Sequence, residues 1–139
     1  MANSPRATGR CLCGAVRFEV RGPMRDIMVC HCVECRRWSG YLGAFTSTRD
    51  EHLALLESSA LRWVESPDSD VKARRGFCGD CGSSLFWKPL ASERINIAVG
   101  TLDRPTGLQL AGHWYAHQAD DYDRLLDATD PDGRTFRWT

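Results

Sequence analysis

The sequence predicts a mainly β domain with little helix, and two observations support this prediction. Apolar and polar residues alternate with a period of two in several short segments, which is typical of strands with one buried and one exposed face. Stretches rich in turn-forming residues separate these segments. The chain has 139 residues, of which 42% are hydrophobic, so we expect it to bury the core of a single domain over residues 1–139.

The clearest alternation runs from Val16 to Val20, where apolar residues are separated by arginine and glutamate. Further apolar segments predict more short strands, and turn-rich stretches divide them. These strands are expected at 61–63, around Phe77, at 85–87 and at 95–99, with turn-rich stretches at 65–70 and 103–107.

Helix is expected only in short pieces. One is predicted at 34–39, after the second cysteine cluster. Another is predicted at 120–126, where Asp120 and Asp121 suit the positive N-terminal end of a helix dipole. The sequence has no internal repeat and no long linker, so no second domain is expected.

Seven cysteines fall into three tight clusters with the spacings CxC, CxCxxC and CxxC. These spacings are typical of metal ligands, because Zn–S bonds of about 2.3 Å require ligand sulfurs within roughly 4 Å of each other. CxC is also a poor disulfide spacing, since the short ring forces the S–S dihedral angle away from about 90°. The clusters are Cys11 and Cys13, then Cys30, Cys32 and Cys35, then Cys78 and Cys81.

A disulfide framework is not expected for this chain. The number of cysteines is odd, and residues 1–10 lack the apolar run of a secretory signal. No stretch of about 18 apolar residues predicts a membrane span. We therefore expect a reduced, cytoplasmic protein whose clustered cysteines bind metal.

The 18 basic and 18 acidic side chains cancel. The chain thus lacks the basic surplus that is typical of nucleic-acid binders and polybasic membrane proteins, so neither partner is expected. Two arginine pairs, Arg36 with Arg37 and Arg74 with Arg75, lie close to cysteine clusters. We interpret each pair either as a solvated face or as groups that offset thiolate charge or bind an acidic ligand.

The first and last cysteine clusters together offer four thiolates for one ion. Cys11 and Cys13 are two residues apart at the start of the first predicted strand, so their side chains are expected on one face. Cys78 and Cys81 belong to a glycine-containing knuckle. Four cysteines complete a tetrahedral site with no position for a substrate, which predicts a structural zinc ion.

The middle cluster offers the three thiolates of Cys30, Cys32 and Cys35. Three protein ligands and an open fourth position are what a catalytic zinc ion needs. Alternatively, Cys32 and Cys35 would join Cys78 and Cys81 in a long-spaced zinc ribbon. A histidine ligand would instead close the three-cysteine site and make it structural. The candidate histidines are His31, His52, His113 and His117.

Three segments carry a resemblance to a known family. They are GRCLCGAVRFEV at 9–20, CHCVECRRWSG at 30–40 and GFCGDCGSSLFW at 76–87. In order and spacing they resemble the signature motifs of the glutathione-dependent formaldehyde-activating enzyme family, also called the Gfa or centromere protein V family. The resemblance continues more weakly to about residue 115, and residues 113–131 depart from the usual tail of the family.

The resemblance implies a β-tent fold of short antiparallel strands with two zinc ions. The implied activity is that of a carbon–sulfur lyase that joins formaldehyde to glutathione as S-hydroxymethylglutathione, so a small thiol is the expected partner. The implied ligands are Cys11, Cys13, Cys78 and Cys81 for a structural zinc ion, and Cys30, Cys32 and Cys35 for a catalytic one.

A substrate thiol at the open position would bind as a thiolate, and we expect Arg36 and Arg37 to bind the carboxylates of a glutathione-like molecule. Trp38, Tyr41 and Phe45 are interpreted either as pocket or as core residues. The competing hypothesis is a non-catalytic, zinc-stabilised module that binds a protein or a nucleic acid. A methionine sulfoxide reductase is disfavoured, because no cysteine remains for it if all seven bind zinc.

Overall fold

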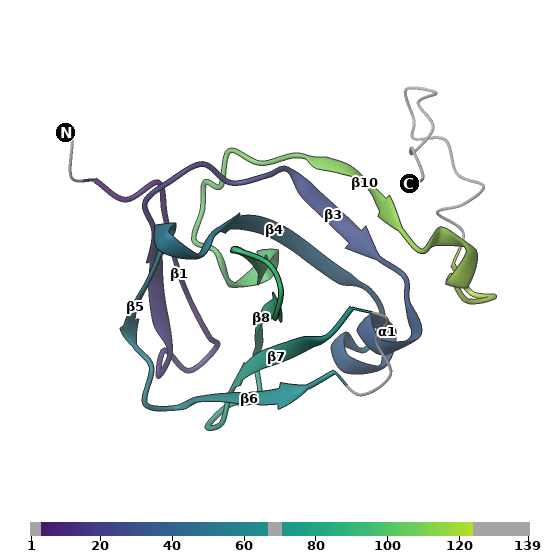
Figure 1. The fold of residues 1–139 in the computed structure, drawn as a ribbon, viewed down its shortest axis with the longest axis horizontal. Coiled ribbons are helices and arrows are strands. Elements are labelled where there is room, and N and C mark those ends of the chain that lie inside the picture. Colours follow the sequence, from purple (N-terminus) through teal and green to yellow (C-terminus); the bar gives the residue numbers. More distant parts are fainter. Residues whose placement is uncertain (1–3, 67–70, 124–139) are drawn as a thin grey trace.

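The computed structural model describes residues 4–66 and 71–123 of the chain. These residues form ten β-strands in two sheets and one short α-helix (Figure 1). The prediction of a mainly β fold with little helix is therefore confirmed. None of the helices in the described residues is long and apolar enough to cross a membrane.

The smaller sheet has three antiparallel strands in the order β1-β2-β5. They are β1 (Ala7–Arg10), β2 (Arg17–Val20) and β5 (Leu53–Glu57). β2 is the strand that the alternation predicted, with Phe18 and Val20 buried and Arg17 exposed. Gly9 permits close packing against it, since a Cβ atom at Gly9 would lie 2.4 Å from the Phe18 ring.

The larger sheet has seven strands in the order β10-β3-β4-β9-β8-β7-β6. Its neighbouring strands are antiparallel except for β10 and β3, which run parallel to each other. This one pair differs from the antiparallel arrangement that was expected. The strands are β3 (Ile27–Cys30), β4 (Gly43–Arg49), β6 (Leu61–Glu65), β7 (Ala73–Cys78), β8 (Ser84–Pro89), β9 (Arg94–Ala98) and β10 (Leu110–Trp114).

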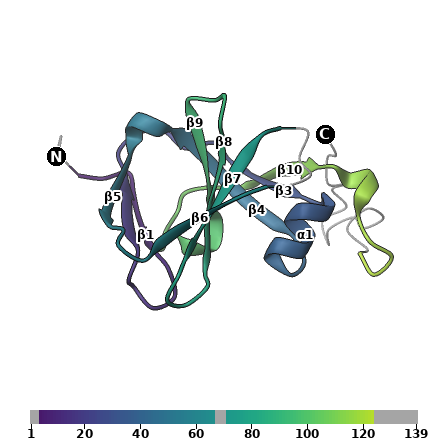
Figure 2. The same cartoon turned by 60° about the horizontal axis from the view of Figure 1, so that its bottom comes forward.

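The α-helix, α1 (Val33–Ser39), confirms the short helix predicted at 34–39. Cys32 caps its N-terminus, and Gly40 ends it in the left-handed conformation with a φ of 91°. Figure 2 shows α1 beside β3 and β4, to which it is joined at its two ends. Three 3-10 helices are also present, at Asp50–His52, Val99–Thr101 and Ala116–Gln118.

The second predicted helix, at 120–126, does not form in its described part. Residues 120–123 make a turn in which the Asp123 N–H donates to the Asp120 carbonyl at 3.0 Å. Residues 124–126 lie outside the described residues, as do residues 67–70 of the turn-rich stretch expected at 65–70.

The strands expected from residue 61 onward are found, except that Val99 begins a 3-10 helix. β3 and β4 were not predicted, because both are buried with little alternation. In β4 even polar side chains are buried, and they bond to a neighbouring loop. The Thr46 hydroxyl donates to the Arg25 carbonyl, and the Thr48 hydroxyl donates to the Pro23 carbonyl at 2.9 Å.

Two clusters of buried residues form the core, and each contains cysteines. In the larger cluster the rings of Phe18 and Phe86, one from each sheet, make an edge-to-face contact with centroids 5.2 Å apart. Cys11 and Cys78 are buried in this cluster. The smaller cluster consists of Cys30, Cys35 and Phe45, with Cys32, Trp87, Ala98 and Trp114 packed against it.

Candidate metal centres and active site

The first and last cysteine clusters meet in the folded chain and form what we call the four-thiol group. The Sγ atoms of Cys11, Cys13, Cys78 and Cys81 all lie within 4.8 Å of one another. Cys13 Sγ is 3.6 Å from Cys11 Sγ and 3.8 Å from Cys78 Sγ. A tetrahedron with Zn–S bonds of about 2.3 Å has sulfur–sulfur edges of about 3.8 Å, so the donor set fits one zinc ion.

Two turns hold the four-thiol group. Cys11 and Cys13 lie in the turn between β1 and β2, rather than on a strand as we expected. Cys78 ends β7, and Cys81 lies in the turn before β8. In that second turn Gly82 has a φ of 80° and its N–H donates to the Cys78 carbonyl at 2.8 Å. Glycine adopts this left-handed conformation without a steric penalty, which explains the knuckle.

Hydrogen-bond donors surround the sulfurs of the four-thiol group. The Val16 N–H donates to Cys11 Sγ at 3.3 Å. The Ser83 hydroxyl lies 3.1 Å from Cys81 Sγ and lowers the pKa of that thiol to about 5. The same hydroxyl accepts from the Leu12 N–H at 2.9 Å, which links the two turns. Such donors favour the thiolate, which is the form of cysteine that binds metal.

The middle cluster forms a second set of sulfurs, which we call the three-thiol group. Cys30 ends β3, Cys32 caps α1 and Cys35 lies in the first turn of α1, and their Sγ atoms lie within 4.8 Å of one another. Hydrogen bonding to Cys30 lowers the pKa of Cys32 to about 2, and the same contact raises the pKa of Cys30. The set offers three ligands to a zinc ion. The zinc-ribbon alternative with Cys78 and Cys81 is not formed.

No histidine joins the three-thiol group within residues 4–66 and 71–123. Both ring nitrogens of His31 lie against other side chains. Its Nε2 is 2.8 Å from His113 Nδ1, and its Nδ1 is 3.2 Å from Asp123 Oδ2. The geometry therefore does not support the alternative in which a histidine closes the site.

His31, His113 and Asp123 form a buried polar network beside the three-thiol group. Their exposed fractions are 2%, 0% and 7%, respectively. Burial lowers the pKa of both histidines, while the Asp123 carboxylate acts in the opposite direction. The network joins the loop between β3 and α1 to β10 and to the turn that ends at Asp123.

A cavity of about 510 Å³ opens beside the three-thiol group, and all three of these cysteines line it. Most of the remaining wall is apolar or aromatic. The other lining residues are Val33, Glu34, Phe45, Val71, Arg75, Trp87, Trp114, Tyr115 and Gln118. The four-thiol group does not line this cavity. The two groups therefore differ in that only the three-thiol group faces this cavity.

Arg75 places a guanidinium group against the three-thiol group. The residue is only 4% exposed, and its Nη2 donates to Cys35 Sγ at 3.5 Å while its Nε donates to Ser66 Oγ at 3.2 Å. From the sequence alone, the two members of the pair Arg74 and Arg75 were not distinguished. Strand alternation separates them, because Arg74 is exposed and its guanidinium stacks 4.4 Å from the Trp63 ring centroid.

Arg36 and Arg37 lie on α1 but do not line the cavity. The Arg36 Nη1 atom is 2.8 Å from Asp120 Oδ2, and Arg37 is exposed. Their expected role as ligands of substrate carboxylates stays a prediction.

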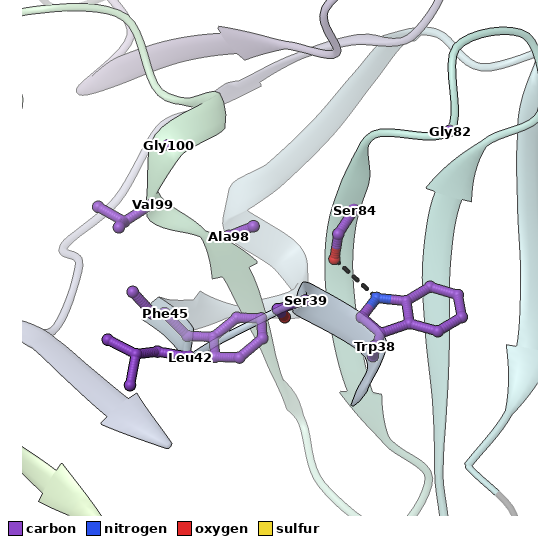
Figure 3. Close-up of a pocket in the computed structure, with 10 residues that line it drawn as sticks. Trp38, Ser39, Leu42, Phe45, Gly82, Ser84, Ala98, Val99 and Gly100 are labelled. Atoms are coloured by element: carbon purple, nitrogen blue, oxygen red, sulfur yellow. Dashed lines mark hydrogen bonds between the residues drawn. The ribbon is translucent and has the colours of Figure 1, made fainter. Parts of the chain in front are cut away.

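The three aromatic residues that follow the middle cluster have different surroundings. Phe45 is buried and lines the cavity. Trp38 lines a neighbouring cavity of about 340 Å³, where its Nε1 donates to Ser84 Oγ at 2.8 Å (Figure 3). Tyr41 is 42% exposed, and its ring centroid lies 5.8 Å from that of Tyr122.

Sequence reasoning missed Trp87, Trp114 and Tyr115 as residues of the cavity wall. The available signal was the position of Trp87 at the end of the third motif and of Trp114 beside His113. Neither position reveals that β8 and β10 bring these rings to the same cavity.

Comparison with known proteins gives one family match and structural neighbours. The family model described as glutathione-dependent formaldehyde-activating enzyme matches residues 6–118. A crystal structure of a Rhodobacter sphaeroides protein from structural genomics is similar to 95% of this chain and 99% of its own, with a TM-score of 0.60 and 20% identity. At this identity the likeness shows the fold alone. The comparison with curated proteins finds no match.

We expect two zinc ions per chain that differ in how easily a chelator removes them. The three-thiol group leaves a position through which a chelator can attack, whereas four cysteines leave none. Metal analysis during a mild chelator titration, with circular dichroism recorded at each point, should show one ion lost while the fold remains. A single ion per chain, or two ions lost together with the fold, would contradict the assignment.

Cys81→Ser should unfold or aggregate the protein, whereas Cys35→Ser should leave it folded with one ion fewer. The first variant removes a ligand that holds two turns more than sixty residues apart in the sequence, and metal-binding energy at such a site is folding energy. Thermal melts and zinc analysis of both variants check this expectation. Equal destabilisation by the two substitutions would show that the three-thiol group is structural too.

Asp123→Asn should lower the free energy of unfolding by about 1–3 kcal/mol, because it weakens a buried hydrogen bond to His31. Asp120→Asn is the matched control. It affects the partly exposed contact with Arg36, and such contacts contribute about 0–1 kcal/mol. Urea unfolding of both variants measures the difference. The same small loss in both would mean that the buried network does not stabilise the fold.

Proposed function

The chain belongs to the glutathione-dependent formaldehyde-activating enzyme family, and from this premise we propose that it makes and breaks a carbon–sulfur bond in the hydroxymethyl adduct of a small thiol. The proposed site is the three-thiol group of Cys30, Cys32 and Cys35. We propose the four-thiol group as a structural zinc site and the three-thiol group as a catalytic one. The family name links its members with formaldehyde and glutathione, and glutathione is the first thiol to test.

The observation that carries this proposal is that only one of the two cysteine groups lines this cavity. All three cysteines of the three-thiol group line a cavity of about 510 Å³, and none of the other four does. A zinc ion held there would supply the ionisation of the substrate thiol, because coordination to zinc deprotonates a thiol at neutral pH. The residues around the ion would determine how the aldehyde approaches the sulfur of this thiol.

The reaction needs no oxidant or reductant. In the synthetic direction the sulfur donates an electron pair to the carbonyl carbon of formaldehyde, and a C–S bond forms. The π electrons of the carbonyl move to its oxygen, which takes up the proton that the thiol has released. A thiol and an aldehyde thus become a hydroxymethyl thioether, and cleavage reverses each of these changes.

Arg75 and the aromatic wall give the chain its own part in this reaction. Three thiolates carry more negative charge than one divalent ion neutralises, and the Arg75 guanidinium beside Cys35 offsets this excess. The apolar wall excludes bulk water and holds the thiol near the aldehyde, which lowers the entropic part of the barrier. Arg36 and Arg37 remain candidates for contacts with a longer substrate at the helix surface.

The proposal includes a cytoplasmic location, because all seven cysteines are free thiols and are needed in reduced form. It also includes a small-molecule thiol as the partner, with no nucleic acid and no membrane. Residues 1–139 are proposed to act as one domain.

Zinc-loaded protein should accelerate exchange between a thiol and its hydroxymethyl adduct in buffered formaldehyde, as measured by NMR exchange spectroscopy. Cys32→Ser should reduce this rate by about 100-fold or more, since substitution of mere outer-shell partners of a metal already costs about 10- to 100-fold. Ser39→Ala is the matched control, because Ser39 is an exposed residue of the same helix.

The thiols to use are glutathione, 2-mercaptoethanol and phenylmethanethiol. If zinc-loaded protein accelerates exchange with none of them, the catalytic proposal is wrong and the zinc-stabilised binding module takes its place.

A further inference from the structure

We propose that the thiol accepted by the three-thiol group is a compact aromatic or branched apolar thiol, with at most one oxygen acceptor beside its sulfur, rather than glutathione. This inference rests on the proposed function, since it names the substrate class of the same site. Its basis is the composition of the cavity wall and the hydrogen bonding of the polar groups in that wall.

The wall of the cavity is aromatic on several sides. Phe45 comes from β4, Trp87 from β8 and Trp114 from β10, and Tyr115 follows β10 directly. Val33 on α1 and Val71 before β7 add aliphatic surface. Three of the rings are thus carried on strands of one sheet, and a cavity of this kind binds flat apolar groups by shape and by exclusion of water.

The Trp114 ring packs against Arg25, a residue that does not line the cavity. The Arg25 guanidinium carbon lies 4.6 Å from the centroid of this ring. Arg25 Nη2 donates to Asn96 Oδ1 at 3.2 Å and to the Phe45 carbonyl at 3.4 Å. The wall is therefore formed before a ligand arrives, and a preformed wall loses little conformational entropy on binding.

The charged residues of the wall are engaged with one another and with the cysteines. Among the described residues that line the cavity, these are Glu34 and Arg75. Both contact the hydroxyl of Ser66, which donates to Glu34 Oε1 at 2.8 Å and accepts from Arg75 Nε at 3.2 Å. Arg75 also donates to Cys35 Sγ, so its charge is directed at the thiolates.

Glutathione fits this wall poorly. It carries carboxylates at both ends and an ammonium group, and any of these that entered the cavity would lose its water. Burying a charge without a partner costs more free energy than apolar contacts return. An apolar thiol meets no such cost, and its ring or branched chain gains from the aromatic wall.

Two N–H donors in the wall define what polar group the substrate can carry. Arg75 Nη1 and Trp87 Nε1 are buried, and neither has a hydrogen-bond partner among the described residues. Arg75 and Trp87 are directly paired across β7 and β8, so they lie on the same face of the sheet. A small rotation of either side chain would offer a donor to one oxygen of the ligand, such as the hydroxymethyl oxygen of the adduct.

Calorimetry with zinc-loaded protein tests this inference with four probes. Phenylmethanethiol should bind at least about 10-fold more tightly than glutathione and 2-mercaptoethanol, since one apolar group in a fitted pocket commonly changes affinity by about 10- to 200-fold. Phenylmethanol, which has the same ring but no sulfur, should bind at least about 10-fold more weakly than phenylmethanethiol, because it offers no thiolate.

Two variants connect this preference to the wall. Trp87→Leu and Trp114→Phe should each reduce the affinity for phenylmethanethiol by a larger factor than the affinity for 2-mercaptoethanol. Trp38→Leu is the control, since Trp38 lines the neighbouring cavity (Figure 3). Zinc content and thermal melts show whether each variant is folded and loaded, and Trp114→Phe keeps an aromatic ring if Trp87→Leu does not fold.

The outcomes separate this inference from the proposed function. If glutathione binds more tightly than phenylmethanethiol, or if phenylmethanol binds as well as phenylmethanethiol, the substrate class is wrong while the catalytic site stands. If zinc-loaded protein binds no thiol at all, the proposed function itself is wrong.

Discussion

The meeting of four sulfurs from two distant turns is the constraint on which the rest of this fold depends. The strands are four to seven residues long, and the smaller sheet contains only three of them. The four-thiol group joins the turn between β1 and β2 to the turn between β7 and β8, and so connects the two sheets where Phe18 meets Phe86. A metal ion at that point would close a long loop in the chain and fix the relative position of the sheets.

The two cysteine groups place the same ligand type in two different settings. In the four-thiol group the sulfurs meet between tight turns, and protein ligands complete the tetrahedron. In the three-thiol group a strand end and the first turn of a helix supply the ligands, and the remaining side faces a cavity. The backbone around the sulfurs, rather than the sulfurs themselves, determines whether a cysteine group faces a cavity.

The sequence was sufficient for features that depend on local spacing and insufficient for those that depend on strand pairing. The three cysteine clusters, β2 and α1 each follow from residues a few positions apart, and the union of the first cluster with the last was predicted because together they supply four ligands. The placement of Arg75 beside Trp87 follows from the register of β7 and β8. Likewise His31 meets His113 because β10 pairs with β3. Arg36 was expected to bind a substrate carboxylate because it follows Cys35 directly. In the structure its guanidinium contacts Asp120, and its role at a substrate stays a prediction.

Because β10 pairs with β3, the last strand of the described residues supports the loop that carries the three-thiol group. All four sulfurs of the four-thiol group exist once the ribosome has passed residue 81. The loop that carries the three-thiol group acquires its buried partners later, because His113 and Asp123 are translated more than thirty residues afterwards. A nascent chain therefore holds all four sulfurs of the four-thiol group while the three-thiol group still lacks these partners. During that interval these thiols are more open to oxidation or to a wrong metal than they are in the folded chain.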